Sequence, residues 1–524
     1  MINPKLNPYL GDEERSFYNT VYQFSEEKVF PTSEERDEKE IWSDDLWKEF
    51  SKAGLTGLTI PQEYGGEGAS CLLCSIATDA FASGSLDGGI GLSWVAHLVI
   101  GTMPIVFQGT EAQKTKYLTK LATGEWMAGF ALTEPASGSD AASLLTRAEE
   151  VEGGWKLNGS KTFITNGPVG QVFVVMARTS EKGRGPMGIS AFIVESHTPG
   201  FKVSKVLKKL GHHTSMTAEL VFEDMIIPKE NLLGPLNTGF MRIGKETLEW
   251  ERTVFVAGLA GAMEFCFRKG IRYANERIQF GKSISSFYGM QDILVRNWVY
   301  IQAARRLIYW VAERKDRGIP SPLESSLGKL ISSELAEDVA KDTVQLFGGY
   351  GYMKEYAVER FYRDVKLGTI GGGTSEIQRS IISSLYSGKE KFQKEFGKIE
   401  SPKNQADLIQ NLLFEIILKM DGETNRKKQQ SIEFAFADVL SVFVILYLSE
   451  IDTHKTIESY PTEEKMIDRK LLSYYLVGKY LMSMSRLNPY VPKELTELWS
   501  LYRELGANIE ETVHSRFATL QELT

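Results

Sequence analysis

The stretch Thr369-Ile370-Gly371-Gly372-Gly373-Thr374-Ser375-Glu376-Ile377 lies between two segments with helical periodicity. Its three consecutive glycines remove every side chain over a short span, so backbone N–H groups can approach a ligand closely and positive φ angles are allowed. The helix that follows should begin near Ser375, with its first N–H groups pointing back at the glycines. Such a turn suits an anion or a polarised carbonyl. A plain helix–helix turn explains the glycines equally well, and the rest of the chain decides between the two.

The totals are those of a soluble globular protein. A chain of 524 residues exceeds one hydrophobic core and predicts three or four domains. The net charge of −8 argues against a nucleic-acid binder. The segment Met1–Arg15 has the pattern of neither a signal nor a transit peptide, and no run approaches 18 consecutive apolar residues. We therefore expect a cytoplasmic protein.

Cysteine and histidine offer no metal site in this sequence. Cys71 and Cys74 have redox-like spacing, but their neighbours form an apolar helical pattern, and a tetrahedral site needs two further ligands. We predict two buried thiols. His97 lies inside another apolar helical run, where we expect a hydrogen-bonded core histidine.

The apolar periodicity divides the chain into four predicted domains, and the fold class is mainly α with a central β domain. Residues 1–127 form an N-terminal helical domain. Short strands then predict a small antiparallel sheet or barrel over residues 128–240; they cover 155–159, 172–177, 189–194 and 219–223.

Long helical periods follow the sheet and predict an antiparallel four-helix bundle over residues 241–395; they cover 243–277, 285–317, 323–348 and 375–386. A Lys/Glu-rich linker near residues 388–403 leads to an additional C-terminal helical domain, residues 396–524. Its run 435–448 is apolar almost all round, so we expect it to be buried.

Five segments carry more specific information. In chain order they are Ala131–Asp140 (ALTEPASGSD), Lys161–Gly167 (KTFITNG), Arg277–Gly281 (RIQFG), Gln345–Gly351 (QLFGGYG) and Gly373–Glu376 (GTSE). Together with the domain order, they resemble the acyl-CoA dehydrogenase family in identity, order and spacing over about residues 10–390. Each segment alone has an ordinary explanation, such as Thr or Ser in a turn or Arg on a solvated face. All five in register favour the family.

The resemblance implies FAD as the cofactor. Phe163 would form an aromatic wall for the flavin ring, where the family usually has Trp, and Thr165 would reach flavin N5 and O4. The pyrimidine edge would meet the Phe130–Thr133 backbone, and Ser139 would bind the pyrophosphate. The other expected cofactor contacts are Leu132, Thr133, Ile164, Thr374 and Glu376, together with Arg277, Phe280, Gln345 and Gly349 toward the FAD of a neighbouring subunit. No G-x-G-x-x-G follows a strand, which disfavours a Rossmann mode.

The family oxidises the Cα–Cβ bond of an acyl thioester, and this reaction needs a carboxylate base. In many members the base is a glutamate directly before the Gly-Thr of the opening stretch, but here that position is Gly372. Isovaleryl-CoA and long-chain acyl-CoA dehydrogenases instead use a Glu-Arg pair on an early turn of a bundle helix. Glu251 and Arg252 match that pair, so we predict Glu251 as the base. A solvated helix glutamate is the competing interpretation.

The same resemblance assigns the substrate contacts. The Gly372 backbone N–H would serve the substrate carbonyl, together with the FAD ribityl 2′-OH. Gly371 and Gly372 leave space that a long or branched acyl chain could fill. Ser139, Glu249 and Arg252 lie where family members contact the acyl-CoA.

The resemblance also implies partners: an acyl-CoA substrate, an electron-transfer flavoprotein as acceptor, and a homodimer or homotetramer, with a role in fatty-acid β-oxidation. Very-long-chain members carry a C-terminal extension that binds membrane. No motif of residues 401–524 supports membrane association, since Arg426-Lys427-Lys428 falls far short of a lipid-binding helix. Two alternatives stay open: an acyl-CoA oxidase or flavin monooxygenase on the same scaffold, and a catalytically inactive relative.

Overall fold

The computed structural model describes residues 3–180, 185–385, 405–420, 426–450, 462–484 and 492–522. The chain forms two compact units. The sheet unit comprises Thr20–Gly261 and Ala312–Pro320, and the bundle unit comprises Met1–Asn19, Ala262–Val311 and Ser321–Thr524. The predicted linker at 388–403 lies outside the described residues.

The helices of the sheet unit begin where a side chain can accept a backbone N–H. Ser43, Ser70, Asp87 and Thr110 each accept a bond from the residue three positions on, satisfying a donor that the first turn leaves open. These side chains start α3 (Asp44–Lys52), α4 (Cys71–Ser85), α5 (Gly88–Val95) and α7 (Glu111–Ala122). Helices α2 (Ser33–Lys39) and α6 (Met103–Gln108) begin without a side-chain cap, and α1 spans Asp12–Phe24.

The apolar helical run that contains His97 is interrupted. A π-helical segment, Ala96–Thr102, separates α5 from α6. Pro104 has no N–H for the regular helical ladder, which explains why the register changes just before it.

The sheet has the strand order β6-β7-β3-β2-β4-β5-β8, and β1 pairs with β4. The predicted antiparallel sheet is right for most pairs and wrong for two, since β1–β4 and β2–β4 run parallel. Neither pair joins consecutive strands, so no hairpin forces them antiparallel. The strands are β1 (Ala128–Ala131), β2 (Arg147–Val151), β3 (Gly154–Thr165), β4 (Val172–Arg178), β5 (Ile189–Glu195), β6 (Phe201–Val206), β7 (Thr217–Pro228) and β8 (Leu232–Leu233).

Strand β4 is buried on both faces, which explains its continuous apolar sequence. Successive side chains of a strand point to opposite faces. Val172, Val174 and Met176 join one core cluster with Tyr117 and Leu118 of α7. The intervening β4 residues join a second cluster with other strands of the sheet, and they are Phe173, Val175 and Ala177. Strand β4 therefore packs against α7 with one face and against other strands of the same sheet with the other.

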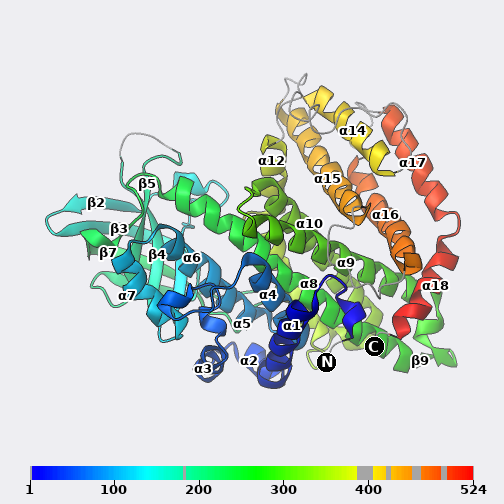
Figure 1. The fold of residues 1–524 in the computed structure, drawn as a ribbon, viewed down its shortest axis with the longest axis horizontal. Helices are drawn as coiled ribbons and strands as arrows, with labels where there is room; N and C mark the ends of the chain where they lie inside the picture. The colour runs from blue at the N-terminus through cyan, green and yellow to red at the C-terminus, as the bar shows by residue number, and fades with distance from the viewer. Residues whose placement is uncertain are drawn as a thin grey trace. The chain divides into compact units, whose positions relative to one another are not determined.

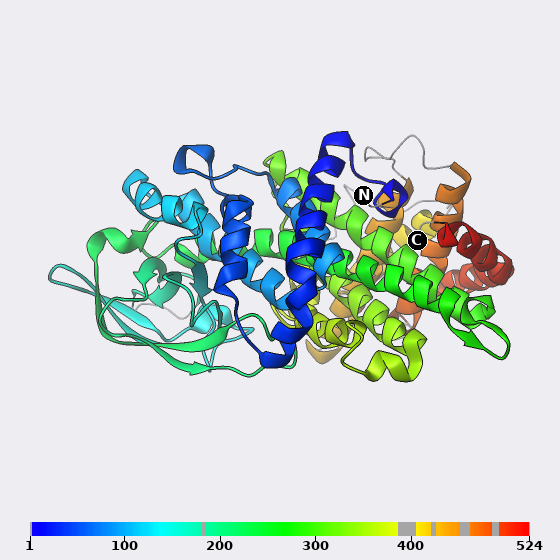
Figure 2. The same ribbon diagram turned by 90° about the horizontal axis from the view of Figure 1, so that it is seen from below.

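The bundle helices match the predicted periods closely. They are α8 (Lys245–Glu276), α9 (Tyr288–Asp316), α10 (Pro322–Phe347), α11 (Val358–Asp364) and α12 (Ser375–Leu385). A short hairpin, β9 (Ile278–Gln279) and β10 (Lys282–Ser283), connects α8 to α9 and projects beyond the ends of these helices in both views (Figure 1, Figure 2).

The predicted C-terminal helical block packs on the bundle. Helix α15 contacts α12, α14 and α16, and Arg379 of α12 lies 2.7 Å from both Asp438 of α15 and Glu334 of α10. The run 435–448 is buried except at Val444 and Tyr447, as expected. The block contains α14 (Gln405–Met420), α15 (Arg426–Glu450), α16 (Thr462–Met484), α17 (Pro492–Gly506) and α18 (Ile509–Gln521).

Two helical stretches, Gly88–Gln108 and Gln429–Ser449, are long and apolar enough to cross a membrane by length and composition alone. In each, 72% of the apolar window is buried inside the protein. Core helices pass the same test, so the finding is weak evidence for a membrane.

Candidate active site

Phe163 occupies a distorted position on β3. The pairing of β3 with β7 shifts register between Lys161 and Ile164, and Phe163 adopts φ +59° with 67% of its surface exposed. A bulge re-aims a side chain, and a bulky residue at positive φ is strained, a feature that clusters at ligand sites. The exposed ring offers a flat apolar face for stacking.

The neighbouring residues of β3 anchor this ring. Ile164 is buried in the core of the sheet, and Thr165, half-buried, pairs with Thr217 of β7. Phe130 and Leu132 are buried at the end of β1, and the Thr133 carbonyl accepts the Thr162 N–H at 2.9 Å. The structure thus brings together the two segments that were predicted to meet the flavin.

A buried ion pair that the sequence did not reveal joins these two segments. The Lys161 ammonium donates to the Glu134 carboxylate at 2.7 Å and to the Leu132 carbonyl at 3.0 Å. Burial lowers the pKa of Lys161 to about 8, against the opposing charge of Glu134. Burial alone would raise the pKa of Glu134, but Lys161 and the N–H groups around it lower it instead. The alternation of side chains along β3 could have indicated that Lys161 points to the buried face of the strand.

Glu134 also organises the loop that ends at Asp140. Its carboxylate accepts the backbone N–H groups of Leu145 at 2.6 Å and Thr146 at 2.9 Å. The Ser137 hydroxyl donates to the Asp140 carbonyl at 2.6 Å. Ser139 is exposed on this constrained loop, where its hydroxyl and N–H can face a phosphate.

Two further buried polar side chains hold β1 in place. The Asn166 amide, at φ +64°, donates to the carbonyls of Ser93 and Ala128, both at 3.0 Å. His97 Nδ1 accepts the Ala128 N–H at 3.0 Å, which places the proton on Nε2, 3.0 Å from the Thr56 carbonyl. Burial lowers the pKa of His97 to about 4. The prediction of a satisfied core histidine is confirmed.

Cys71 and Cys74 lie on the first turns of α4, and both thiols are buried and free, as predicted. Burial raises the pKa of each thiol well above its usual value. Neither is poised as a nucleophile, because the thiolate is the reactive form.

The predicted base lies on the second turn of α8, in the sheet unit. The Glu251 and Arg252 side chains are partly buried. Burial lowers the pKa of Arg252, while the charges of Glu251 and Glu249 oppose this. Lys315 pairs with Glu249 at 3.2 Å. The second turn of α8 therefore holds several charged side chains in a poorly solvated environment, an arrangement typical of functional sites.

The glycine-rich stretch forms the turn that the sequence predicted. Gly372 and Gly373 adopt φ +62° and +97°, and α12 begins at Ser375. The carbonyls of both glycines accept from Gln378 Nε2, at 3.0 and 3.2 Å, and Lys329 donates to the Gly373 carbonyl at 2.6 Å. These bonds fix the orientation of the peptide planes.

The start of α12 carries two expected cofactor residues. The Thr374 hydroxyl accepts the Ile377 N–H at 3.3 Å and so caps the helix. A hydrogen bond from its own backbone N–H, and a second from Thr374, lower the pKa of Glu376. Gly371 N–H donates to the Leu367 carbonyl at 2.8 Å, which ties the glycines to the preceding 3-10 turn.

The residues expected to reach a neighbouring subunit lie around the β9–β10 hairpin. Arg277 and Gly349 line a cavity of about 520 Å³ together with Tyr350, whose ring lies 5.6 Å from the guanidinium. Phe280, at the hairpin tip, adopts φ +53° and is 92% exposed. Gln345 is exposed on the last turn of α10.

The expected site residues thus divide between the two units. The sheet unit carries Phe130, Leu132, Thr133, Ser139, Phe163, Ile164, Thr165, Glu249, Glu251 and Arg252, and the bundle unit carries Arg277, Phe280, Gln345, Gly349, Gly371, Gly372, Thr374 and Glu376. The residues of the sheet unit fit a flavin. The exposed, strained ring of Phe163 lies next to Thr165 and to the backbone at the end of β3.

Comparisons with known proteins match three family models in sequence. These are the acyl-CoA dehydrogenase N-terminal domain at residues 11–125, the middle domain at 129–225 and the C-terminal domain at 237–385. An acyl-CoA dehydrogenase of Bacillus subtilis (strain 168) is 40% identical over 380 residues, covering 72% of this chain and 99% of the relative. A mitochondrial isovaleryl-CoA dehydrogenase of Solanum tuberosum is 39% identical, covering 73% and 92%.

A solved structure also matches the C-terminal block. The acyl-CoA dehydrogenase of Bacillus anthracis complexed with FAD has a TM-score of 0.84 and 27% identity, covering 98% of this chain and 95% of that one. The helices beyond residue 385 are therefore shared with that longer relative.

Proposed function

This chain belongs to the acyl-CoA dehydrogenase family, is an oxidoreductase and uses FAD, and from this premise we propose that it converts acyl-CoA to trans-2-enoyl-CoA with Glu251 as the base. The position that carries a glutamate in many relatives is Gly372, which cannot take a proton. Glu251 is then the carboxylate that removes the α-proton.

The proposed reaction breaks two C–H bonds. The α-proton is weakly acidic, so the site has to stabilise negative charge on the thioester oxygen while Glu251 removes the proton. The Gly372 N–H donates to that oxygen. Hydrogen bonds from Gln378 and Lys329 to the glycine carbonyls fix the orientation of the peptide groups in this turn. FAD, when bound, supplies the acceptor for the β-hydrogen, which leaves as a hydride.

The observation that supports this assignment most directly is the position of Glu251 next to a poorly solvated Arg252 on α8. Burial lowers the pKa of Arg252, and Glu251 is one of the two carboxylates that oppose this. The similarity to an isovaleryl-CoA dehydrogenase supports the same placement.

For the substrate we propose a long or branched acyl chain in fatty-acid β-oxidation, because Gly371 and Gly372 bring no side chain to the turn. The isovaleryl-CoA relative favours branching. As the acceptor we propose an electron-transfer flavoprotein. A homo-oligomer is supported by the Arg277 cavity and the exposed Phe280, which would otherwise leave a large ring in water.

The decisive test is anaerobic mixing of the FAD-loaded protein with short, branched and long acyl-CoAs while the flavin absorbance is followed. We expect one chain class to bleach the flavin, and Glu251→Gln to keep FAD yet slow bleaching by about 10²–10⁴-fold. Glu27→Gln, on an exposed helical turn of the same unit, is the matched control. Equal bleaching by wild type and Glu251→Gln would refute the base assignment.

The same preparation separates a dehydrogenase from an oxidase. After bleaching, air is admitted and the return of the flavin band is timed. Slow return, accelerated by an electron-transfer flavoprotein, supports the proposal. Return within a turnover on O₂ alone would favour the oxidase or monooxygenase, and no bleaching by any acyl-CoA would indicate an inactive relative.

A further inference from the structure

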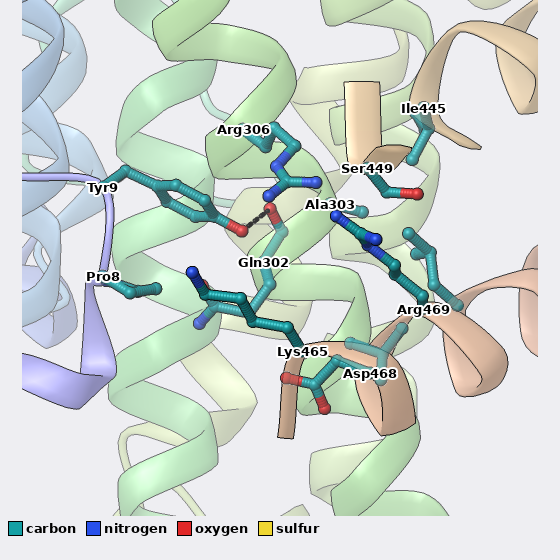
Figure 3. Close-up of a pocket in the computed structure, with 12 residues that line it drawn as sticks. Pro8, Tyr9, Gln302, Ala303, Arg306, Ile445, Ser449, Lys465, Asp468 and Arg469 are labelled. Carbon is teal, nitrogen blue, oxygen red and sulfur yellow. Dashed lines mark hydrogen bonds between the residues drawn. The ribbon is translucent and has the colours of Figure 1, made fainter. Parts of the chain in front are cut away.

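A second polar cavity lies in the bundle unit, among segments far apart in the sequence. It has a volume of about 50 Å³ and lies between the start of the chain, α9, α15 and α16 (Figure 3). A water molecule needs about 10–15 Å³ of such space, so the cavity holds about four water-sized groups. That is the size of one tetrahedral oxyanion.

Three cationic side chains line this cavity. Arg306 enters from α9, and Lys465 and Arg469 enter from α16 one turn apart. In Figure 3, Arg306 lies above Tyr9, Lys465 lies below it, and Arg469 lies across the space from it. Because the three cations lie in one small cavity, an anion bound between them would be attracted by all three.

The single carboxylate in the lining is already committed. Asp468 accepts from Arg516 Nε at 2.7 Å and from Arg516 Nη2 at 2.9 Å, and from the Trp298 indole at 3.3 Å. Among the residues that the structure describes, no carboxylate lies within ion-pair distance of Arg306 or Arg469. Arg306 and Arg469 therefore present positive charge to the cavity that no described carboxylate pairs with.

Arg306 is held in place but not saturated. Its Nη1 donates to the Leu448 carbonyl at 2.9 Å, and its guanidinium lies 5.4 Å from the Tyr9 ring. Its Nε is buried and has no hydrogen-bond partner. A buried guanidinium N–H without an acceptor is costly, and an oxyanion would remove that cost.

Tyr9 adds a neutral wall. Its hydroxyl donates to the Gln302 carbonyl at 3.4 Å, and burial raises the pKa of the phenol, so it carries no negative charge to offset the cations. Ser449 lies on the opposite wall, where its hydroxyl donates to the Leu446 carbonyl at 2.6 Å. The remaining lining is mainly apolar, so water screens the cations less than at an open surface.

We propose that this cavity binds a phosphate group, either as inorganic phosphate or as the phosphate of a small monoester, through Arg306, Lys465 and Arg469. Guanidinium forks match phosphate oxygens bidentately, and the lysine adds a point charge. The site is separate in sequence from the residues expected to bind FAD and acyl-CoA. Its occupation would join the first residues of the chain to the C-terminal block.

The test is calorimetric titration of the full-length, FAD-loaded protein with inorganic phosphate and, separately, with glycerol 3-phosphate, at constant ionic strength set by NaCl. The double variant Lys465→Gln/Arg469→Gln should weaken phosphate binding by about tenfold or more. The control Arg503→Gln removes one charge from an exposed site on α17 of the same block and should leave binding within about twofold. The flavin spectrum and the urea unfolding midpoint report whether each variant is folded.

Binding of phosphate alone would mean that the cavity encloses the whole anion, and binding of both ligands that it takes a terminal phosphate. Either result supports the site if the double variant loses it. If the double variant fails to fold, Arg469→Lys, which keeps the charge and removes the fork, should weaken binding by a smaller factor. No heat with either ligand in wild type would overturn the proposal. So would equal affinity in wild type and the variants, which would place any phosphate at the FAD or acyl-CoA sites.

Discussion

The ammonium group of Lys161 lies 2.7 Å from the carboxylate of Glu134, and neither side chain has more than 4% of its surface exposed. This contact joins the end of β1 to β3 through the Leu132 carbonyl, and so joins the two segments assigned to the flavin. A buried charge pair contributes little when intact, but removing one partner leaves the other charge without compensation.

We therefore expect Lys161→Met to lower the free energy of unfolding by about 3–5 kcal/mol and to reduce FAD retention. Lys202→Met breaks an exposed pair with Glu223 in the same sheet and should cost no more than about 1 kcal/mol. Urea denaturation and the flavin-to-protein absorbance ratio measure both effects. Equal losses in the two variants would show that the buried pair has no special role.

At Phe163 we expect the stability of the flavin-free protein and the affinity for FAD to change in opposite directions. Its φ of +59° is strained for a phenylalanine, so Phe163→Gly should stabilise the flavin-free protein by about 1 kcal/mol or leave it unchanged. The same change removes the stacking face and should weaken FAD binding. The two readouts are urea unfolding without FAD and fluorescence titration with FAD. A less stable flavin-free variant with normal FAD affinity would contradict both expectations.

We expect His97 to make the free energy of unfolding fall at acidic pH. Burial lowers its pKa from the usual 6.5 to about 4, so between these values the unfolded chain binds more protons than the native one. Stability due to His97 is therefore complete above about pH 6.5 and is lost as the pH falls toward 4. Between pH 7 and 4.5 the loss is about 2 kcal/mol.

His97→Gln should remove this part of the pH dependence, so the difference between the variant and wild type should shrink as the pH falls. His197→Gln, at an exposed imidazole, is the control. Urea unfolding at several pH values between 7 and 4.5 gives the two curves. Parallel curves for wild type and His97→Gln would show that the imidazole does not titrate in this range.

The glycine-rich turn predicts an asymmetry between neighbouring glycines. Gly372 adopts φ +62°, so Gly372→Ala should cost about 1 kcal/mol of unfolding free energy. At Gly371 a Cβ would lie 3.4 Å from the Leu367 carbonyl oxygen, which is ordinary contact, so Gly371→Ala should be tolerated. Urea midpoints of the two variants decide the matter, and a larger cost at Gly371 would be the contrary result.

Sequence patterns predicted the elements whose burial is regular. The apolar run of β4 and the long periods of α8, α9 and α10 gave bounds within a few residues of the structure. Strand β6 was missed, because its side chains are mostly exposed and its apolar alternation extends only over Phe201 and Val203. The π-helical segment at Ala96–Thr102 was missed because its apolar pattern is that of an ordinary helix.

The candidate site was predicted through short segments that resemble a family, and the structure adds what such segments cannot contain. The Lys161–Glu134 pair joins residues 27 positions apart across a fold that the sequence alone does not place. The bulge at Phe163 depends on the register of β3 against β7, which local propensity does not set. Long-range pairing and strain are properties of the assembled sheet.

The bundle unit is discontinuous, since it begins with residues 1–19 and resumes only at residue 262. The Leu6 carbonyl, at its start, accepts from Arg305, a partner 299 residues later. At synthesis rates of about 5–20 residues per second, the ribosome delivers that partner roughly 15–60 seconds after Leu6. Residues 1–19 are therefore made long before the part of the bundle unit that buries them, and until then the apolar side chains of Leu6 and Leu10 lack their native packing partners.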